Sequence, residues 1–238
     1  MKPLPRSFAS SPAPRRAAGM RRRFRSAAPF ALVCVLAGGL AGCTSGLLQS
    51  HAPPVQQYVL HVAPAAQPPT TPAGAHPSLR LLRPLPGPGL DTDRIALLQP
   101  GNRMDYYAAA RWNGQLAEVL SSLAVETLRG SGTWSTVVDY RTAFNADYQL
   151  QVGIGHFEAD YSGSGTGGGS DAAPVVNVTL DCLLIRRTDG AVAASFSTTA
   201  SQPAAQNRMG SVVAAFEAAV NQALAQAAGE VARTAAHP

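Results

Sequence analysis

The chain has 238 residues, a formal net charge of +5 and a sequence pI of about 9.5. The first 42 residues hold eight of the 19 basic residues and none of the 14 acidic ones, so the remainder carries a formal charge of −3. This distribution excludes a basic nucleic-acid-binding surface on the main part of the chain. An intramolecular disulfide beyond residue 43 is also excluded, because Cys182 is the single cysteine there.

The N-terminal region has the parts of a secretory signal. Four arginines at positions 21–25 precede an apolar run at 30–40 and two small residues, Ala41 and Gly42. The run is too short to span a bilayer, which needs about 20 apolar residues. We therefore expect residues 1–42 to be a signal peptide. Its natural start is expected at Met20, with a longer n-region from residue 1 as the alternative.

Leu40-Ala41-Gly42-Cys43 resembles the bacterial lipoprotein box, in which the cysteine is acylated and becomes the first mature residue. A thiol at this position can form a thioether to diacylglycerol, and several acyl chains on one residue anchor a protein stably. We predict lipid attachment at Cys43 and a flexible tether over residues 43–54. The alternative is an ordinary secretory signal with an incidental cysteine.

Strand patterns follow the tether in chain order. β-forming residues predict a first strand over 55–62, before a Pro-rich connection at 63–78 that cannot join a central sheet. Further strands are expected at 78–84 and 94–98, and residues 103–107 are expected to form a hairpin with the latter. Longer alternating runs predict three neighbouring strands in a meander at 147–154, 175–185 and 191–197. Phe157 is out of phase with the first run, which indicates a bulge at Gly153 or Gly155. A Gly-rich tip is expected at 162–170.

Two helices are predicted from apolar residues at helical spacing. The first follows Asn113 as N-cap and ends at Gly130 and Gly132, and the second covers about 209–233. Its apolar stripe is expected to cover the apolar face of the meander. The predicted fold class is therefore α+β: a single domain over residues 55–235, with a mainly antiparallel sheet covered by two helices.

Catalytic motifs are absent from the sequence, and we expect neither enzymatic activity nor a bound metal or cofactor. The best candidate cluster is His156, Glu158 and Asp160, which share one strand face. Such residues can bind metal, but the favoured interpretation is a solvated strand face. Trp112, after Arg111, is expected to be tucked against the sheet, with an exposed binding anchor as the alternative. Cys182 is expected to be a small buried side chain.

The order of these elements resembles the ABC-type transport auxiliary lipoproteins, the family of the lipoprotein in the Pqi intermembrane transport system. The residues that carry the resemblance are Tyr58-Val-Leu60, Leu90-Asp-Thr-Asp-Arg-Ile95, Met104-Asp-Tyr-Tyr-Ala108 and Arg111-Trp112, followed by Leu120 and Leu128. It covers about residues 55–235. The long connection at 63–78 and the Gly-rich tip depart from the family pattern.

This resemblance implies an accessory role in transport. The expected partners are a mammalian-cell-entry (MCE) domain protein of the periplasm and its ABC transporter, which move lipids between the inner and outer membranes. Thr44 after the lipidated cysteine, in place of Asp, implies the periplasmic face of the outer membrane. A homo-oligomeric ring of copies is compatible with docking to a ring-shaped partner. The alternative function is an outer-membrane lipoprotein that regulates a cell-wall synthase.

Overall fold

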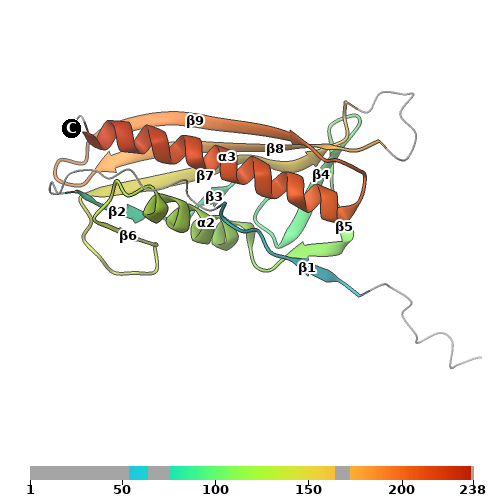
Figure 1. Cartoon of the computed structure of the whole chain (residues 1–238), viewed down its shortest axis with the longest axis horizontal. Helices are drawn as coiled ribbons and strands as arrows, with labels where there is room; N and C mark the ends of the chain where they lie inside the picture. Colours follow the sequence, from blue (N-terminus) through green and yellow to red (C-terminus); the bar gives the residue numbers. More distant parts are fainter. Residues whose placement is uncertain (1–53, 64–75, 164–171, 237–238) are drawn as a thin grey trace, which may run out of the picture. The chain divides into compact units, whose positions relative to one another are not determined.

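A computed structural model of the protein describes residues 54–63, 76–163 and 172–236 (Figure 1). The predicted signal peptide, Cys43 and the tether up to residue 53 lie outside the described residues. The same is true of residues 64–75 in the Pro-rich connection and residues 164–171 in the Gly-rich tip. The described residues all belong to one compact unit.

Three long antiparallel strands form the meander that the alternating runs predict. They are β7 (Tyr148–Asp160), β8 (Val175–Arg186) and β9 (Val192–Pro203). The pairing of β7 with β8 shifts register between Ile154 and His156, which confirms a bulge at Gly155. Because side chains alternate between faces, this shift moves Phe157 onto the buried face.

Six shorter strands complete a nine-stranded sheet within the described residues. They are β1 (Gln56–Tyr58), β2 (Ser78–Leu81), β3 (Leu85–Pro86), β4 (Arg94–Gln99), β5 (Arg103–Trp112) and β6 (Thr136–Val138). Strands β2, β3 and β4 pair in parallel with successive parts of β7, β5 is antiparallel to β4, and β1 is parallel to β5. The sheet is therefore mixed. Its long pairs are antiparallel, as expected, whereas its short pairs are mostly parallel.

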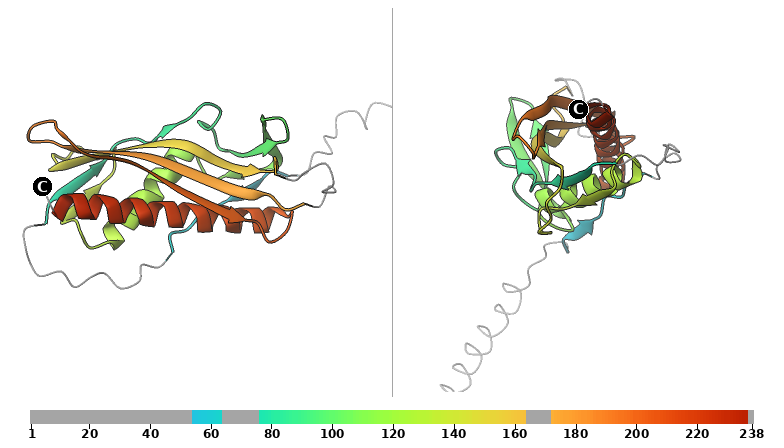
Figure 2. Two further views of the ribbon diagram at one scale, coloured as in Figure 1. Left: turned by 90° about the horizontal axis from the view of Figure 1, so that it is seen from above. Right: turned by 90° about the vertical axis from the view of Figure 1, so that its left-hand side faces the viewer.

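Both helices pack on the same face of this sheet, α2 (Leu116–Gly130) beside α3 (Met209–Ala236) (Figure 2). Their predicted apolar stripes are buried, including Leu120 and Val220. The predicted N-cap at Asn113 is wrong, because α2 begins after Gln115, whose side chain makes no cap hydrogen bond. Instead the N–H of Leu116 donates to the carbonyl of Thr92 at 3.0 Å. A distant loop thus satisfies a backbone donor that an N-cap side chain often takes.

An aromatic cluster lies between sheet and helices at one end of the core. The ring of Trp112 packs edge to face against Phe157 and Phe216, and those two rings stack on each other. Trp112 is 2 % exposed, which confirms that it is tucked against the sheet. The structure places it at the end of β5. The α+β class with two covering helices is confirmed.

Candidate functional site

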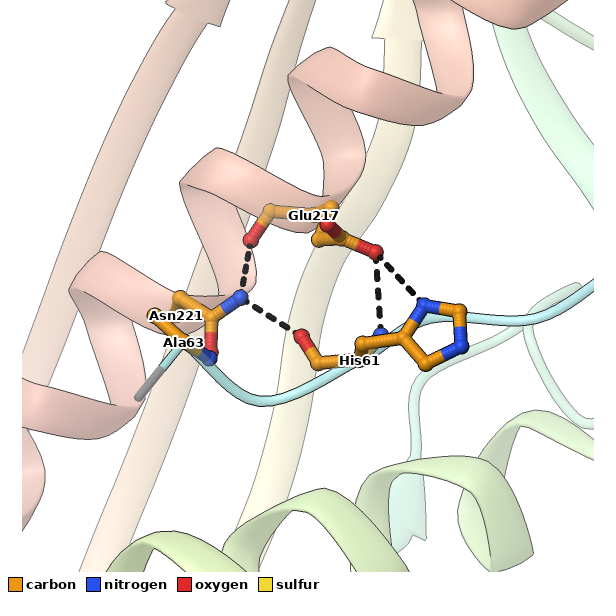
Figure 3. A network of polar contacts seen from close by, with 4 residues as sticks. All are labelled: His61, Ala63, Glu217 and Asn221. Carbon is orange, nitrogen blue, oxygen red and sulfur yellow. Dashed lines mark hydrogen bonds and ion pairs between the residues drawn. The ribbon is translucent and has the colours of Figure 1, made fainter. Parts of the chain in front are cut away.

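Residues 54–63, here called the N-terminal strap, lie against helix α3 through a set of side-chain hydrogen bonds (Figure 3). The carboxylate of Glu217 accepts from the backbone N–H of His61 at 3.0 Å, and the His61 ring nitrogen Nδ1 lies 3.3 Å from the same oxygen. The amide of Asn221 accepts from the N–H of Ala63 at 2.9 Å and donates to the carbonyl of His61 at 2.8 Å. Two side chains one helical turn apart therefore bind an extended backbone, as a neighbouring strand would.

The inner side of the strap carries its apolar contacts. Leu60 is buried, while Tyr58 and Val62 are partly buried against the core. Their spacing of two residues follows from the extended backbone, which directs alternate side chains to one side. The carbonyl of Tyr58 also accepts from the N–H of Asn113 at 3.0 Å. The strap thus connects β5, the start of α2 and the middle of α3.

Two open hollows lie along the solvent side of α2. The first, about 330 Å³, lies between α2 and the strap, with Val59 and Leu60 in its lining. The second, about 470 Å³, lies between α2 and residues 139–142. Both hollows share Ser122 and Glu126. Arg141 contributes exposed ion pairs to Glu118 (3.3 Å) and Asp139 (3.9 Å). Exposed pairs of this kind contribute little stability, so their groups can be redirected to a binding partner.

A small apolar void lies between the two helices and the sheet within the described residues. It measures about 10 Å³ and is lined by apolar side chains of α2, α3, β7 and β8. A space of this size is about that of one water molecule and cannot hold an acyl chain. Cys182 lines the void and is 3 % exposed, as expected for a small buried side chain. Burial, together with the neighbouring carboxylate of Asp181, raises the pKa of its thiol to about 12.

The predicted cluster at His156 resolves into a pair. The ring nitrogen Nδ1 of His156 lies 2.8 Å from Glu158, and the second carboxylate oxygen of Glu158 accepts from the N–H of Phe157 at 2.7 Å. Asp160 instead accepts from the N–H of Ser162. Within the described ranges, no group of three His, Cys, Asp or Glu side chains is placed to hold a metal ion. The expectation of a solvated face is right for His156 and wrong for Glu158, whose side chain is 4 % exposed.

The contact between strap and α3 was not foreseen from the sequence. The sequence pattern that could have indicated this contact is the polar pair Glu217 and Asn221, four residues apart on an Ala-rich helix. Such a pair is common on any solvated helix face. His61, which Glu217 binds, lies 156 residues away in sequence. The contact is therefore visible in the folded structure and not in the sequence.

The described part of the chain is thus an α+β domain with a buried apolar core and open polar hollows beside α2. Residues 58–228 match the family described as ABC-type transport auxiliary lipoprotein component, and the chain belongs to this family. It is therefore an auxiliary, membrane-anchored lipoprotein of an ABC-type transport system. Among curated proteins, none matches the sequence. Of the helices within the described residues, none combines the length and apolarity needed to cross a membrane.

Solved structures share the fold. Protein XCC0632 from Xanthomonas campestris, assigned to the DUF330 family, has a TM-score of 0.65 and 24% identity over 76% of this chain and 96% of that chain. An uncharacterized protein has a TM-score of 0.53 and 14% identity over 76% of this chain and 98% of that chain. At these identities the similarity establishes the fold alone.

Proposed function

We propose that this chain is a periplasmic lipoprotein anchored to the outer membrane, and that it serves an MCE/ABC-type system that moves lipids between membranes. The observation that carries the proposal is the family match over residues 58–228. In this proposal residues 1–42 are a signal peptide, Cys43 carries the lipid, residues 43–54 are a tether and residues 55–235 are the working domain. Thr44, in place of Asp, supports the outer membrane as destination.

The geometry supports a role in docking over one in carrying cargo. The apolar void between helices and sheet is about 10 Å³, whereas sites for organic ligands usually measure about 300–1,000 Å³. The hollows along α2 reach that size range, but they are open and lined by polar and charged groups such as Glu118, Glu126 and Arg141. Such a surface suits a protein partner better than acyl chains. An MCE-domain protein and its ABC transporter are the proposed partners.

The test is crosslinking in living cells with tagged full-length protein, followed by membrane extraction and mass spectrometry of the captured proteins. Recovery of an MCE-domain protein with its ABC subunits is the expected result. Recovery of a cell-wall synthase without an MCE protein would overturn the transport assignment in favour of synthase regulation. The size of the crosslinked species also reports whether copies of the chain form a ring.

Lipid attachment is tested separately with a Cys43→Ser variant. The wild-type protein is expected in the outer-membrane fraction with the mass of an acylated N-terminal cysteine. The variant is expected to lose both the acyl mass and the membrane fractionation. An unmodified Cys43 in the wild-type protein would refute the anchor and leave the family assignment unaffected.

A further inference from the structure

We propose that the N-terminal strap is a releasable clamp whose docking on α3 sets the length of the tether between lipid-bearing Cys43 and the domain. The contacts between the strap and α3 do not depend on the proposed function. The effect on the length of the tether does, because it rests on the proposed lipid anchor at Cys43. The proposal follows from the position of the strap in the chain, the nature of its contacts and the small part of the core that it covers.

The strap lies between the proposed anchor and the rest of the domain. When it is docked, the first residue held in the sheet is Gln56, 13 residues after Cys43. When it is released, the first residue held in the sheet is Ser78, 35 residues after Cys43. At roughly 3.3 Å per extended residue, the greatest reach of the tether rises from about 43 Å to about 115 Å. Release therefore changes how far the domain can stand from its membrane.

The contacts of the strap are of a kind that opens locally. Within the strap only Leu60 is buried; Gln56, Gln57 and Val59 are exposed. β1 pairs with β5 over three residues at the edge of the sheet, so its loss leaves β5 paired with β4. Segments with few buried contacts and exposed hydrogen bonds open at a lower free energy than the core. The strap can therefore leave while the meander and both helices stay folded.

Glu217 and Asn221 hold the strap through its backbone. Three of the four contacts that cross from α3 to the strap involve main-chain N–H or C=O groups of His61 and Ala63; Figure 3 shows those of His61. Release also alters the first hollow along α2, because Val59 and Leu60 are part of its lining. A partner that binds this hollow would therefore favour one state of the strap. This couples docking on α2 to the reach of the tether.

The first test is hydrogen exchange followed by mass spectrometry, on the mature lipoprotein in vesicles and in detergent. Asn221→Ala removes two of the four contacts between α3 and the strap and is expected to raise exchange of residues 56–63 by about tenfold or more. Peptides from β7 and β8 are expected to be unchanged. The matched control is Gln222→Ala, which removes a neighbouring side-chain amide on α3 that bonds to Gln202 instead. Equal exchange of the strap in both variants, or a uniform rise over the whole domain, would overturn the proposal.

The second test measures the reach. A fluorophore on Thr188→Cys, in the exposed turn after β8, reports energy transfer to acceptor lipids in the vesicle. Asn221→Ala is expected to lower transfer efficiency relative to Gln222→Ala, and equal efficiency would refute a change of reach. Flotation tests the lipid anchor by itself, because protein that does not float with vesicles lacks the anchor. The exchange test in detergent does not need the anchor and still decides whether the strap is releasable.

Discussion

The ring of Trp112 meets the ring of Phe216 edge to face, with centroids 5.2 Å apart and an interplanar angle of 83°. This contact joins the end of β5 to α3, two elements that lie about a hundred residues apart in sequence. Phe157 of β7 completes the cluster. The strap pairs with this end of β5 through β1 and bonds to Glu217, next to Phe216, so the cluster also supports the surface on which the strap lies.

Trp112→Ala is expected to lower the free energy of unfolding by about 3–5 kcal/mol, because it leaves a large cavity among fully buried side chains. Urea denaturation followed by circular dichroism measures the loss. The matched control is Arg111→Ala, which removes a half-exposed ion pair with Asp93 at 3.2 Å and is expected to cost less than about 1 kcal/mol. Similar losses in the two variants would contradict the packing role of Trp112.

Asp147 is expected to make folding sensitive to acid. Its carboxylate accepts from the N–H and the hydroxyl of Ser78 at 2.8 and 2.7 Å, and these bonds lower its pKa below the ordinary value of 3.8. Because the folded pKa is lowered, the carboxylate stabilises the fold above pH 3.8, and this contribution is lost as the pH falls through the folded pKa.

Asp147→Asn is expected to cost about 1 kcal/mol at neutral pH, a modest value because the carboxylate is exposed. The variant should lose less stability than the wild type between pH 5 and 2, measured by urea denaturation at each pH. Asp189→Asn, an exposed carboxylate in the turn between β8 and β9, serves as control. An unchanged acid profile in Asp147→Asn would contradict the assigned role.

Cys182 is expected to resist thiol reagents in the folded protein. Its thiol is buried and its pKa is raised to about 12, so almost no thiolate forms at pH 8. Unfolding in guanidinium should restore rapid labelling, which mass spectrometry of the Cys182 peptide follows. Rapid labelling in the native state would show that the interior opens.

The same shift predicts a loss of stability in alkali. The folded thiol keeps its proton up to about pH 12, whereas the unfolded thiol releases it near 9. Stability from this group is therefore present below pH 9 and declines as the pH rises toward 12. Cys182→Ala is expected to have a flatter profile over this range, and an equally steep one would assign the decline to other groups.

Glu158 and His156 are expected to differ in their effect on stability. Glu158→Ala leaves the buried N–H of Phe157 without its acceptor, which costs about 1–3 kcal/mol. His156→Ala removes an exposed ring, so we expect less than about 1 kcal/mol and an unchanged fold. Thermal melts of both variants provide the comparison. A larger loss for His156→Ala would show that the imidazole holds the carboxylate in place.

Much of the architecture follows from local sequence patterns. Alternating apolar residues predicted β7, β8 and β9, and the phase change at Phe157 predicted the bulge. Helical spacing predicted α2 and α3 with their buried faces. These patterns succeed because the side-chain period of an element depends on its own backbone geometry. The parallel pairs that β2, β3 and β4 make with β7 have no comparable signal, because burial of a face does not specify strand direction.

For the candidate site too, some features follow from the sequence and others from the tertiary structure. The sequence by itself determined the α+β class and the family resemblance, because both depend on local patterns and on their order along the chain. It also predicts lipid attachment at Cys43 from the four residues of the lipoprotein box. Only the tertiary structure decided that Glu158 is buried, that Thr92 caps α2 and that Glu217 and Asn221 bind the strap. The hydrogen bonds join residues that are distant in sequence, and the burial of Glu158 depends on the elements that pack around its side chain. Their energies come from desolvation and hydrogen-bond geometry, which exist once the whole core has assembled.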